Sequence, residues 1–260
     1  MNLSEELLEA FKGFSGAHGQ TDVSQERTAG KQKAKSFIVR NPLTLELIEG
    51  HISGKKGIGA IPINEENKCR FGALDIDEYP LDHNKLIDKL EELKVPCIVC
   101  RSKSGGAHIF FFFKEWMNAG DFRDKAAEIS SALGHGRCEI FPKQEQILVE
   151  RGDVGNFINL PYFDSEQTLR YAIIRRDGDY VEASLSEFIE EIQKVKTLPK
   201  DFLTLPIGGP VDLLPNYIPC LRTKLAIGVF EGERNRTAFQ LGVFLQRLDP
   251  GNWKIKFEEH

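Results

Sequence analysis

The sequence is poor in cysteine, has no long apolar run and lacks a secretion signal, and each shortage excludes a class of protein. Its 260 residues include five cysteines, an odd number, which argues against a disulfide framework. The longest apolar stretch covers residues 109–113, far short of the ~20 residues that a membrane-spanning helix needs. The acidic, amphipathic N-terminus has no basic segment ahead of an apolar run, as a signal peptide would have. We therefore expect a cytoplasmic protein.

Two of the cysteines, Cys97 and Cys100, form a CxxC pair, but no second pair stands at the spacing of a zinc finger. They lie in the apolar segment VPCIVCRS, which has the pattern of a buried strand. We interpret both as thiols of the core.

The composition is that of an ordinary globular domain, and its charged residues are not predominantly of one sign. Hydrophobic residues make up 41% and charged residues 28% of the chain, and the net charge is −5. That balance disfavours a nucleic-acid partner on average, yet basic residues gather at 27–40, at Lys55 and Lys56, and at Arg101 and Lys103. A local basic surface is enough to hold a phosphate backbone. The alternative for each run is a solvated face without a ligand.

Apolar periodicity predicts an α+β fold. Residues 1–14 have helical spacing, residues 15–35 contain almost no large apolar side chain and predict a loop or mobile arm, and a strand at 37–39 leads into a helix that Thr44 caps. Further strands are expected at 57–63, 70–77, 97–101, 108–113, 138–142 and 169–175, an apolar segment at 155–163, and helices at 81–93, 122–133, 184–195 and 237–248. From residue 70 onward the order is that of a split, ferredoxin/RRM-like βαββαβ sheet.

An Asp-Ile-Asp tripeptide ends one of the expected strands. Positions i and i+2 of a strand point to one face, so Asp75 and Asp77 project together. Paired carboxylates repel one another, and a hard divalent cation such as magnesium or manganese relieves that repulsion. The alternative is a common strand-end tripeptide whose acids are merely solvated.

A glycine-containing turn follows between two strongly apolar strands. Ser104, Gly105 and Gly106 form the turn, and consecutive backbone N–H groups in such turns can bind anions. Arg101 and Lys103 add positive charge there. His108 opens the next strand on the face of Phe110 and Phe112, where it needs a polar partner, and a phosphate oxygen would serve. A hairpin turn with a hydrogen-bonded core histidine is the alternative.

A third acid, Glu139, opens the strand CEIFP, and Lys143 lies four residues further on. In isolation such a pair is a surface feature.

The order and spacing of these motifs resemble the archaeo-eukaryotic primase superfamily, in particular the prim-pol branch of phages, plasmids and other mobile elements. That family has a DxD at a strand end, an SxH-type motif in a strand pair, and a lone acid after them. Asp75-Ile76-Asp77, the run from Ser104 to His108, and Glu139 match these in turn. The serine stands four residues before the histidine instead of two, and the lone acid is Glu where many relatives have Asp. The tracts EIFPKQ and GNFINLPYF add to the likeness, which covers about residues 36–200.

The resemblance implies a DNA primase/DNA polymerase that uses two Mg²⁺ or Mn²⁺ ions. Asp75, Asp77 and Glu139 would be the catalytic metal ligands. Single-stranded DNA template, primer and nucleoside triphosphates would be the partners, with a helicase domain or protein as a further candidate. The implied nucleotide-binding residues are Arg101, Lys103, Ser104, Gly105, Gly106, His108, Lys143 and Asn159.

Composition and the same likeness together give the domain organisation: residues 15–35 have a loop-like composition, and a Pro-rich, loop-like stretch covers 198–219. We expect a helix and mobile arm over 1–35, the catalytic domain over 36–200 with an N-terminal α/β unit ahead of the split sheet, and a linker over 201–219. Residues 220–260 resemble the start of a helical primase-C-terminal module, so the natural protein is expected to continue beyond residue 260.

Two other functions use the same features. A metal-dependent nuclease or phosphodiesterase could use the three acids without a triphosphate grip. A non-catalytic module for single-stranded nucleic acid could use a ferredoxin-like sheet, but such modules expose aromatic residues on the sheet face. Residues 110–113 are too continuously apolar for that role.

Overall fold

The computed structural model describes the backbone of residues 2–28, 31–207 and 234–248. The chain divides into two compact units, one of Met1–Ala127 with Cys138–Leu205 and one of Glu128–Arg137 with Pro206–His260. Every motif discussed above lies in the first unit except those of the C-terminal segment. Within the described residues, no helix is both long and apolar enough to cross a membrane.

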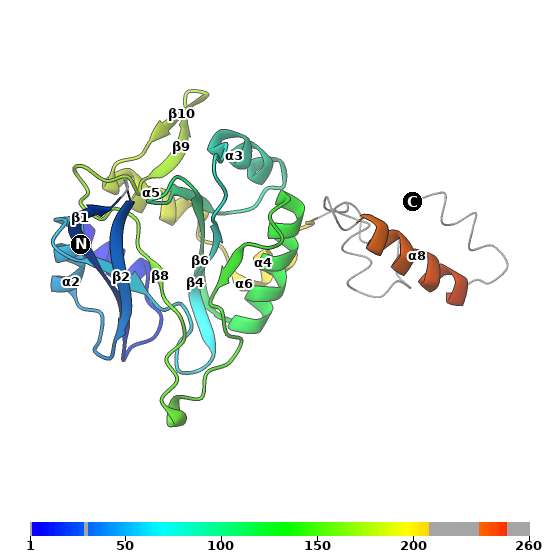
Figure 1. The fold of residues 1–260 in the computed structure, drawn as a ribbon, viewed down its shortest axis with the longest axis horizontal. Coiled ribbons are helices and arrows are strands. Elements are labelled where there is room, and N and C mark those ends of the chain that lie inside the picture. The colour runs from blue at the N-terminus through cyan, green and yellow to red at the C-terminus, as the bar shows by residue number, and fades with distance from the viewer. Residues whose placement is uncertain (1, 29–30, 208–233, 249–260) are drawn as a thin grey trace. The chain divides into compact units, whose positions relative to one another are not determined.

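A six-stranded antiparallel sheet forms the centre of the first unit (Figure 1). Four of its strands lie in the order β7-β4-β6-β5, with β7 at one edge of the sheet, and α3 (His83–Glu92) and α4 (Ala119–Leu133) connect them in the sequence β4-α3-β5-β6-α4-β7. This is the predicted split βαββαβ arrangement, now confirmed. The strands are β4 (Lys68–Ile76), β5 (Ile98–Arg101), β6 (Ala107–Asn118), β7 (Glu139–Phe141), β9 (Ala172–Arg176) and β10 (Asp179–Glu182).

A second, four-stranded sheet has the order β2-β1-β3-β8 and is the main departure from the sequence prediction. Residues 15–35, expected as a loop or mobile arm, instead contain β1 (His18–Thr28) and the start of β2 (Lys31–Val39). β1 pairs with both β2 and β3 (Gly57–Ala60), while β8 (Ile158–Asn159) closes the other side. The prediction was wrong because strand pairing satisfies this polar backbone without large apolar side chains: Thr21 Oγ1, for example, lies 3.0 Å from Ser36 Oγ and donates to Asn159 Oδ1 at 2.9 Å.

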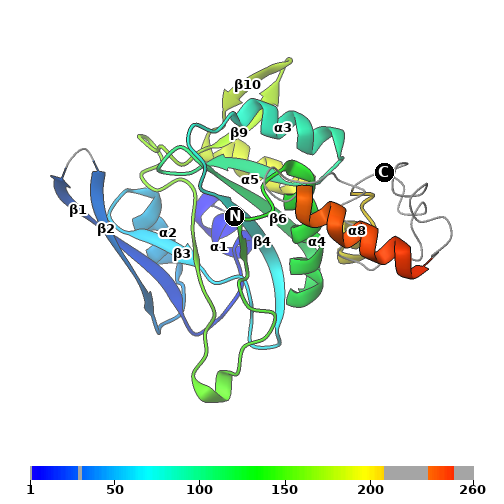
Figure 2. The ribbon, with the colours of Figure 1, turned by 45° about the vertical axis from the view of Figure 1, so that its right-hand side comes forward.

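One face of the six-stranded sheet shares a hydrophobic core with the four-stranded sheet and the N-terminal helices. The helices α1 (Leu3–Ala10) and α2 (Leu45–Ile52) belong to this part of the molecule (Figure 2). Phe11, which follows α1, makes edge-to-face contacts with Phe71, Phe110 and Phe112 of the large sheet. Ile58 and Ile158 of the small sheet belong to the same buried cluster. Thr44 caps α2 as predicted, accepting a hydrogen bond from Leu47 N at 3.4 Å.

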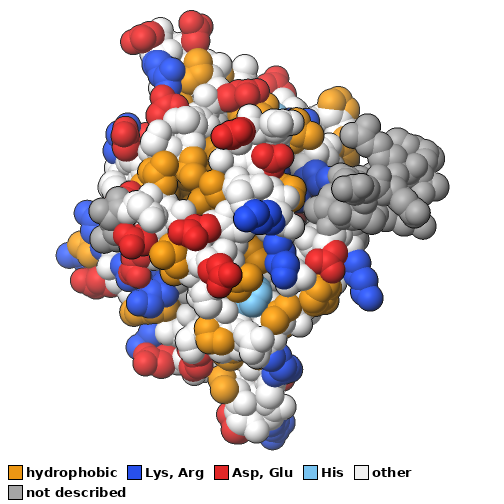
Figure 3. All heavy atoms as spheres, turned by 90° about the vertical axis from the view of Figure 1, so that its left-hand side faces the viewer, with side chains coloured by type: hydrophobic (Ala, Val, Ile, Leu, Met, Phe, Trp, Pro, Cys, Tyr) orange, Lys and Arg blue, Asp and Glu red, His pale blue; other side chains and the backbone are white. Residues whose placement is uncertain are grey.

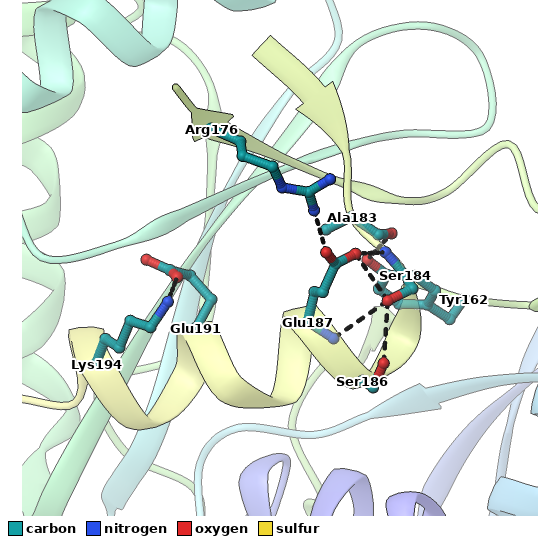
Figure 4. Close-up of polar contacts among 8 residues, drawn as sticks. All are labelled: Tyr162, Arg176, Ala183, Ser184, Ser186, Glu187, Glu191 and Lys194. Carbon is teal, nitrogen blue, oxygen red and sulfur yellow. Dashed lines mark hydrogen bonds and ion pairs between the residues drawn. The ribbon is translucent and has the colours of Figure 1, made fainter. Parts of the chain in front are cut away.

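The helix α5 (Leu185–Val195) packs on that same core through Phe188 and Ile192. Ser184 caps this helix. The Glu187 carboxylate accepts a hydrogen bond from Ser184 N and also pairs with Arg176 of β9 (Figure 4). Tyr162 lies under the start of this helix and donates from its hydroxyl to the Ala183 carbonyl at 2.8 Å. These contacts attach β9 firmly to the core.

The opposite face of the large sheet is covered by α4 and by the short helix α6 (Pro199–Leu203). Phe202 of α6 is fully buried and contacts Phe111, Phe113 and Phe122. Phe202, at the start of the expected linker over 201–219, thus belongs to the hydrophobic core. Residues 208–219 of that linker lie outside the described part of the chain. The expected helix at 237–248 is present as α8 (Arg234–Leu248).

A chain that ends at residue 205 is therefore expected to keep the cooperative thermal unfolding of the first unit. Leu205 O accepts a hydrogen bond from Lys125 Nζ at 3.1 Å, so this end is attached to α4. A chain that ends at residue 198 loses Phe202 and should unfold at a lower temperature with a broader transition. Scanning calorimetry of the two truncations checks this, and equal transitions would show that α6 is dispensable.

Candidate active site

The acidic and histidine motifs meet on one row of the large sheet. Asp75 on β4 lies directly opposite His108 on β6 and directly opposite Glu139 on β7. Because residues directly opposite one another share a face of an antiparallel sheet, the three side chains leave the same face. It is the face that carries Phe110 and Phe112 further along the strand. The row begins where this apolar core ends.

Asp75 is the central and least satisfied member of the row. His108 Nε2 lies 3.3 Å from Asp75 Oδ1, within ion-pair distance, and the two side chains are only 13% and 19% exposed. The contact lacks hydrogen-bond geometry, so Asp75 Oδ1 is buried without a hydrogen-bond partner among the described residues. A buried carboxylate oxygen in that condition is costly and needs a donor or a cation.

Asp77 lies just beyond the end of β4 and is tied to the neighbouring turn. Tyr79 donates from its hydroxyl to Asp77 Oδ1 at 2.8 Å. Burial and this hydrogen bond raise the pKa of the Tyr79 phenol. The tyrosine therefore ties the second acid of the DxD to the bend that follows β4.

Glu139 is the exposed member of the row. Its Oε1 lies 2.7 Å from Lys143 Nζ, and the two side chains are 56% and 35% exposed. Lys143 also lies 5.0 Å from the centroid of the Phe141 ring. The predicted Glu–Lys pair is thus present, and it stands at the edge of the row that contains Asp75.

The three carboxylates are the kind of ligand that a divalent cation prefers, although they do not converge on one position. Among the described residues, no group of three His, Cys, Asp or Glu side chains is close enough to hold a metal ion as it stands. Asp75, Asp77 and Glu139 nevertheless supply hard oxygen ligands from adjoining positions, and Asp75 Oδ1 is a buried acceptor without a donor. A cation is the species that would satisfy it.

The turn between β5 and β6 is closed by its own backbone. Ser102 N donates to Gly106 O at 2.8 Å, and Gly105 N donates to Ser102 O at 3.0 Å. The Gly105 N–H is therefore used inside the turn. Gly105 has φ +97°, a left-handed value that favours glycine. At Gly106 a Cβ would lie 2.2 Å from Ile76 O, so the turn is packed directly against the DxD strand.

Two of the predicted nucleotide-binding residues are not directed to this row. Arg101 donates from Nη1 to the Leu169 carbonyl at 3.0 Å. Asn159 lies in the four-stranded sheet, where its side chain accepts from Thr21. Their polar groups are engaged in holding strands together.

Sequence reasoning missed two buried basic side chains, His51 and Arg170. His51 is completely buried, accepts from Ile58 N at Nδ1 over 3.0 Å, and has its Nε2 2.8 Å from Pro161 O. Nδ1 is thus the acceptor and Nε2 carries the proton, so the ring is neutral. Burial lowers the pKa of His51 to about 4, with the charge of Arg170 as a further cause. His51 joins α2 to the two strands on either side of it and has no free nitrogen for a ligand.

The buried, neutral His51 makes the fold sensitive to acid. The pKa of a histidine is 6.5 in the unfolded chain, whereas the pKa of the folded His51 is about 4. The contribution of this group to the free energy of unfolding is therefore fully present above pH 6.5 and is lost as the pH falls from 6.5 toward 4. We expect the free energy of unfolding to fall by roughly 1.4 kcal/mol between pH 7.5 and 5.5 from this group. Urea unfolding at both pH values measures it. A His51→Gln variant should be less stable at pH 7.5 but lose that part of the slope, and an unchanged slope would contradict the assignment.

The basic runs expected to bind a backbone are only partly described. Side chains of residues 23–34 lie outside the described part, Arg40 donates to the Gly152 carbonyl at 2.9 Å, and Lys55 and Lys56 are exposed. The face in Figure 3 intersperses acidic and basic side chains among apolar ones and has no continuous basic field.

Comparison with known proteins agrees with the geometry of the row. A family model described as "TOTE conflict system, Archaeo-Eukaryotic Primase domain" matches residues 9–198. The match includes the DxD, the turn with His108, and Glu139. No curated protein matches the chain significantly.

Proposed function

Because the chain belongs to the archaeo-eukaryotic primase domain family of TOTE conflict systems, we propose that it is a primase-polymerase, a template-directed nucleotidyltransferase that adds nucleotides on single-stranded DNA. The observation that carries the proposal is the row Asp75, His108 and Glu139, in which a buried carboxylate oxygen has no hydrogen-bond partner within the described structure.

Each member of the site has a role that its surroundings support. Asp75, Asp77 and Glu139 would hold magnesium or manganese ions, which supply charge neutralisation at the reacting phosphate and activation of the attacking 3′-hydroxyl. Tyr79 holds the Asp77 carboxylate in place through its hydroxyl. Lys143 neutralises Glu139 and is free to turn from that carboxylate to a phosphate oxygen when the acid takes another partner.

His108 and Lys103 lie on the nucleotide side of the proposal. His108 touches Asp75, so its Nε2 is placed where a triphosphate oxygen would approach the acids. Lys103 stands on the turn, whose contact with Ile76 fixes its distance from the DxD. Phosphoryl transfer depends mostly on such positioning and charge. Arg101 and Asn159 are left out of the nucleotide site because their side chains bind elsewhere.

A primer-extension assay on single-stranded DNA tests the proposal. The protein is incubated with a labelled primer–template, ribo- or deoxyribonucleoside triphosphates, and magnesium or manganese, with and without a chelator. We expect metal-dependent, template-directed elongation. Shortening of the primer would favour a nuclease, and binding without any turnover in manganese would favour a non-catalytic module.

The structure already weakens the second of these rivals. Phe110, Phe111, Phe112 and Phe113 are at most 1% exposed. They cannot serve as the stacking platform that a ferredoxin-like sheet uses for single-stranded nucleic acid.

A further inference from the structure

Arg170 is a buried cation without a counter-charge. It is 7% exposed, and its Nη1 has no hydrogen-bond partner in the described part of the molecule. No described carboxylate forms an ion pair with it, and its guanidinium carbon lies 5.6 Å from the centroid of the Phe163 ring. Burial lowers the pKa of Arg170. A desolvated, unpaired guanidinium destabilises the ligand-free fold unless a ligand compensates.

The side chain stands on the same face of the sheet as the acids. Ala172 lies opposite Cys100, which in turn lies opposite His108 of the catalytic row. The backbone pairing continues beyond these residues, because Arg101 N donates to Tyr171 O at 2.8 Å. Continued past the ends of β5 and β9, this register sets Arg170 opposite Ser102, and the period of two returns both to the face of His108 and Asp75.

A second unpartnered donor lies at this position. Ser102 is 6% exposed, and its Oγ is buried without a hydrogen-bond partner among the described residues. Lys103 follows it, half-buried, and Ser104 is exposed. Burial and then the charge of Arg170 lower the pKa of the Lys103 ammonium, so the two cations repel one another. Hydrogen-bond donors are therefore present both near the surface, at Lys103, and in the interior, at Ser102 and Arg170. A bound anion would reduce the repulsion between the two cations and would accept the hydrogen bonds that Ser102 and Arg170 do not make.

Hydrogen bonds hold the backbone of Arg170 in position at the base of its side chain. Its carbonyl accepts from Tyr162 N at 2.7 Å, and its N–H donates to Thr168 Oγ1 at 2.9 Å. The Tyr162 hydroxyl accepts from Ala172 N at 3.1 Å and donates to the Ala183 carbonyl just ahead of α5 (the second bond is drawn in Figure 4). Arg170 thus lies just ahead of β9, and these hydrogen bonds hold its backbone in place.

We propose that Arg170, Ser102 and Lys103 form an anion subsite that takes the polyphosphate chain of the incoming nucleotide. The identification of the anion rests on the proposed function. The existence of the subsite rests on the buried, uncompensated guanidinium and hydroxyl. Lys103 meets the phosphate at the surface, and Arg170 supplies the buried positive charge beneath it, where the low dielectric makes that charge effective.

The test uses inorganic pyrophosphate in the presence of a chelator, so that no divalent ion contributes. Its affinity and the thermal midpoint are measured for the parent chain, Arg170→Met, Arg170→Lys and the control Arg176→Met, which changes an exposed arginine at the far end of β9. We expect Arg170→Met to bind pyrophosphate at least about tenfold more weakly, the loss of one hydrogen bond to a charged group. Its ligand-free midpoint should equal or exceed that of the parent. Arg170→Lys should keep part of the affinity, and Arg176→Met all of it.

Other results would overturn the subsite. Unchanged pyrophosphate affinity in Arg170→Met would do so, and so would a lowered midpoint or failure to fold, since either would make Arg170 a structural residue. Loss of oligonucleotide binding with unchanged pyrophosphate binding would assign the charge to the DNA backbone. Extension that fails in the parent chain while pyrophosphate binding depends on Arg170 would leave the subsite standing and refute the polymerase.

Discussion

Replacing Asp75 and Asp77 together by asparagine should reduce primer extension by about 1000-fold or more, which corresponds to about 4 kcal/mol of transition-state stabilisation. The two carboxylates are the proposed metal ligands nearest the end of β4, and asparagine keeps their shape while removing their charge. Steady-state extension in magnesium and in manganese measures the effect. The Asp75 oxygen already lacks a hydrogen bond in the described structure, so the loss of its charge should not lower the thermal midpoint.

The control is Asp124→Asn, which removes an exposed carboxylate from α4 on the other face of the sheet. It should extend primers like the parent. Extension by the double variant within tenfold of the parent would remove both acids from the catalytic site. A large drop in its thermal midpoint would instead show that the pair is part of the fold.

The elements with local signals could be predicted from the sequence. Thr44 and Ser184 are N-caps, because a hydroxyl at that position accepts from the first free N–H groups of the helix. The four strands of the split sheet have apolar side chains that alternate or run continuously, and β4, β5, β6 and β7 were all expected near their observed bounds. The family motifs added the DxD, His108 and Glu139.

The features that depend on long-range pairing could not be predicted. β1 contains mostly polar side chains, and its place in a sheet depends on backbone pairing with β2 and β3. Composition alone could not distinguish such a strand from a loop. Arg170 is unremarkable in the sequence LRYAIIR. It enters the proposed anion subsite only because β9 pairs with β5, so that the continued register sets it opposite Ser102 from a distant part of the chain. The motifs therefore gave the candidate residues, whereas the pairing and burial of their side chains required the fold.

The second large effect is expected at His108, where the structure offers two roles. Its Nε2 lies 3.3 Å from Asp75 Oδ1, and its ring packs edge-to-face on Phe110 at 5.8 Å. If the histidine grips the triphosphate, His108→Ala loses a hydrogen bond to a charged group, about 1.5–3 kcal/mol. That corresponds to roughly 10- to 150-fold weaker nucleotide affinity or transition-state binding. Binding of single-stranded DNA alone should stay nearly unchanged.

A core role would give a different result, since the loss of packing on Phe110 would lower the thermal midpoint and reduce DNA binding and turnover together. His108→Gln separates the two, because its amide can donate near the position of Nε2 but cannot reproduce the ring contact. Gripping the phosphate predicts partial recovery of nucleotide affinity in His108→Gln relative to His108→Ala, whereas packing predicts none. Normal nucleotide affinity, turnover and stability in His108→Ala would refute both roles. We expect the phosphate grip, because His108 on β6 stands between Asp75 on β4 and the strand β5 that leads to the proposed Arg170 subsite.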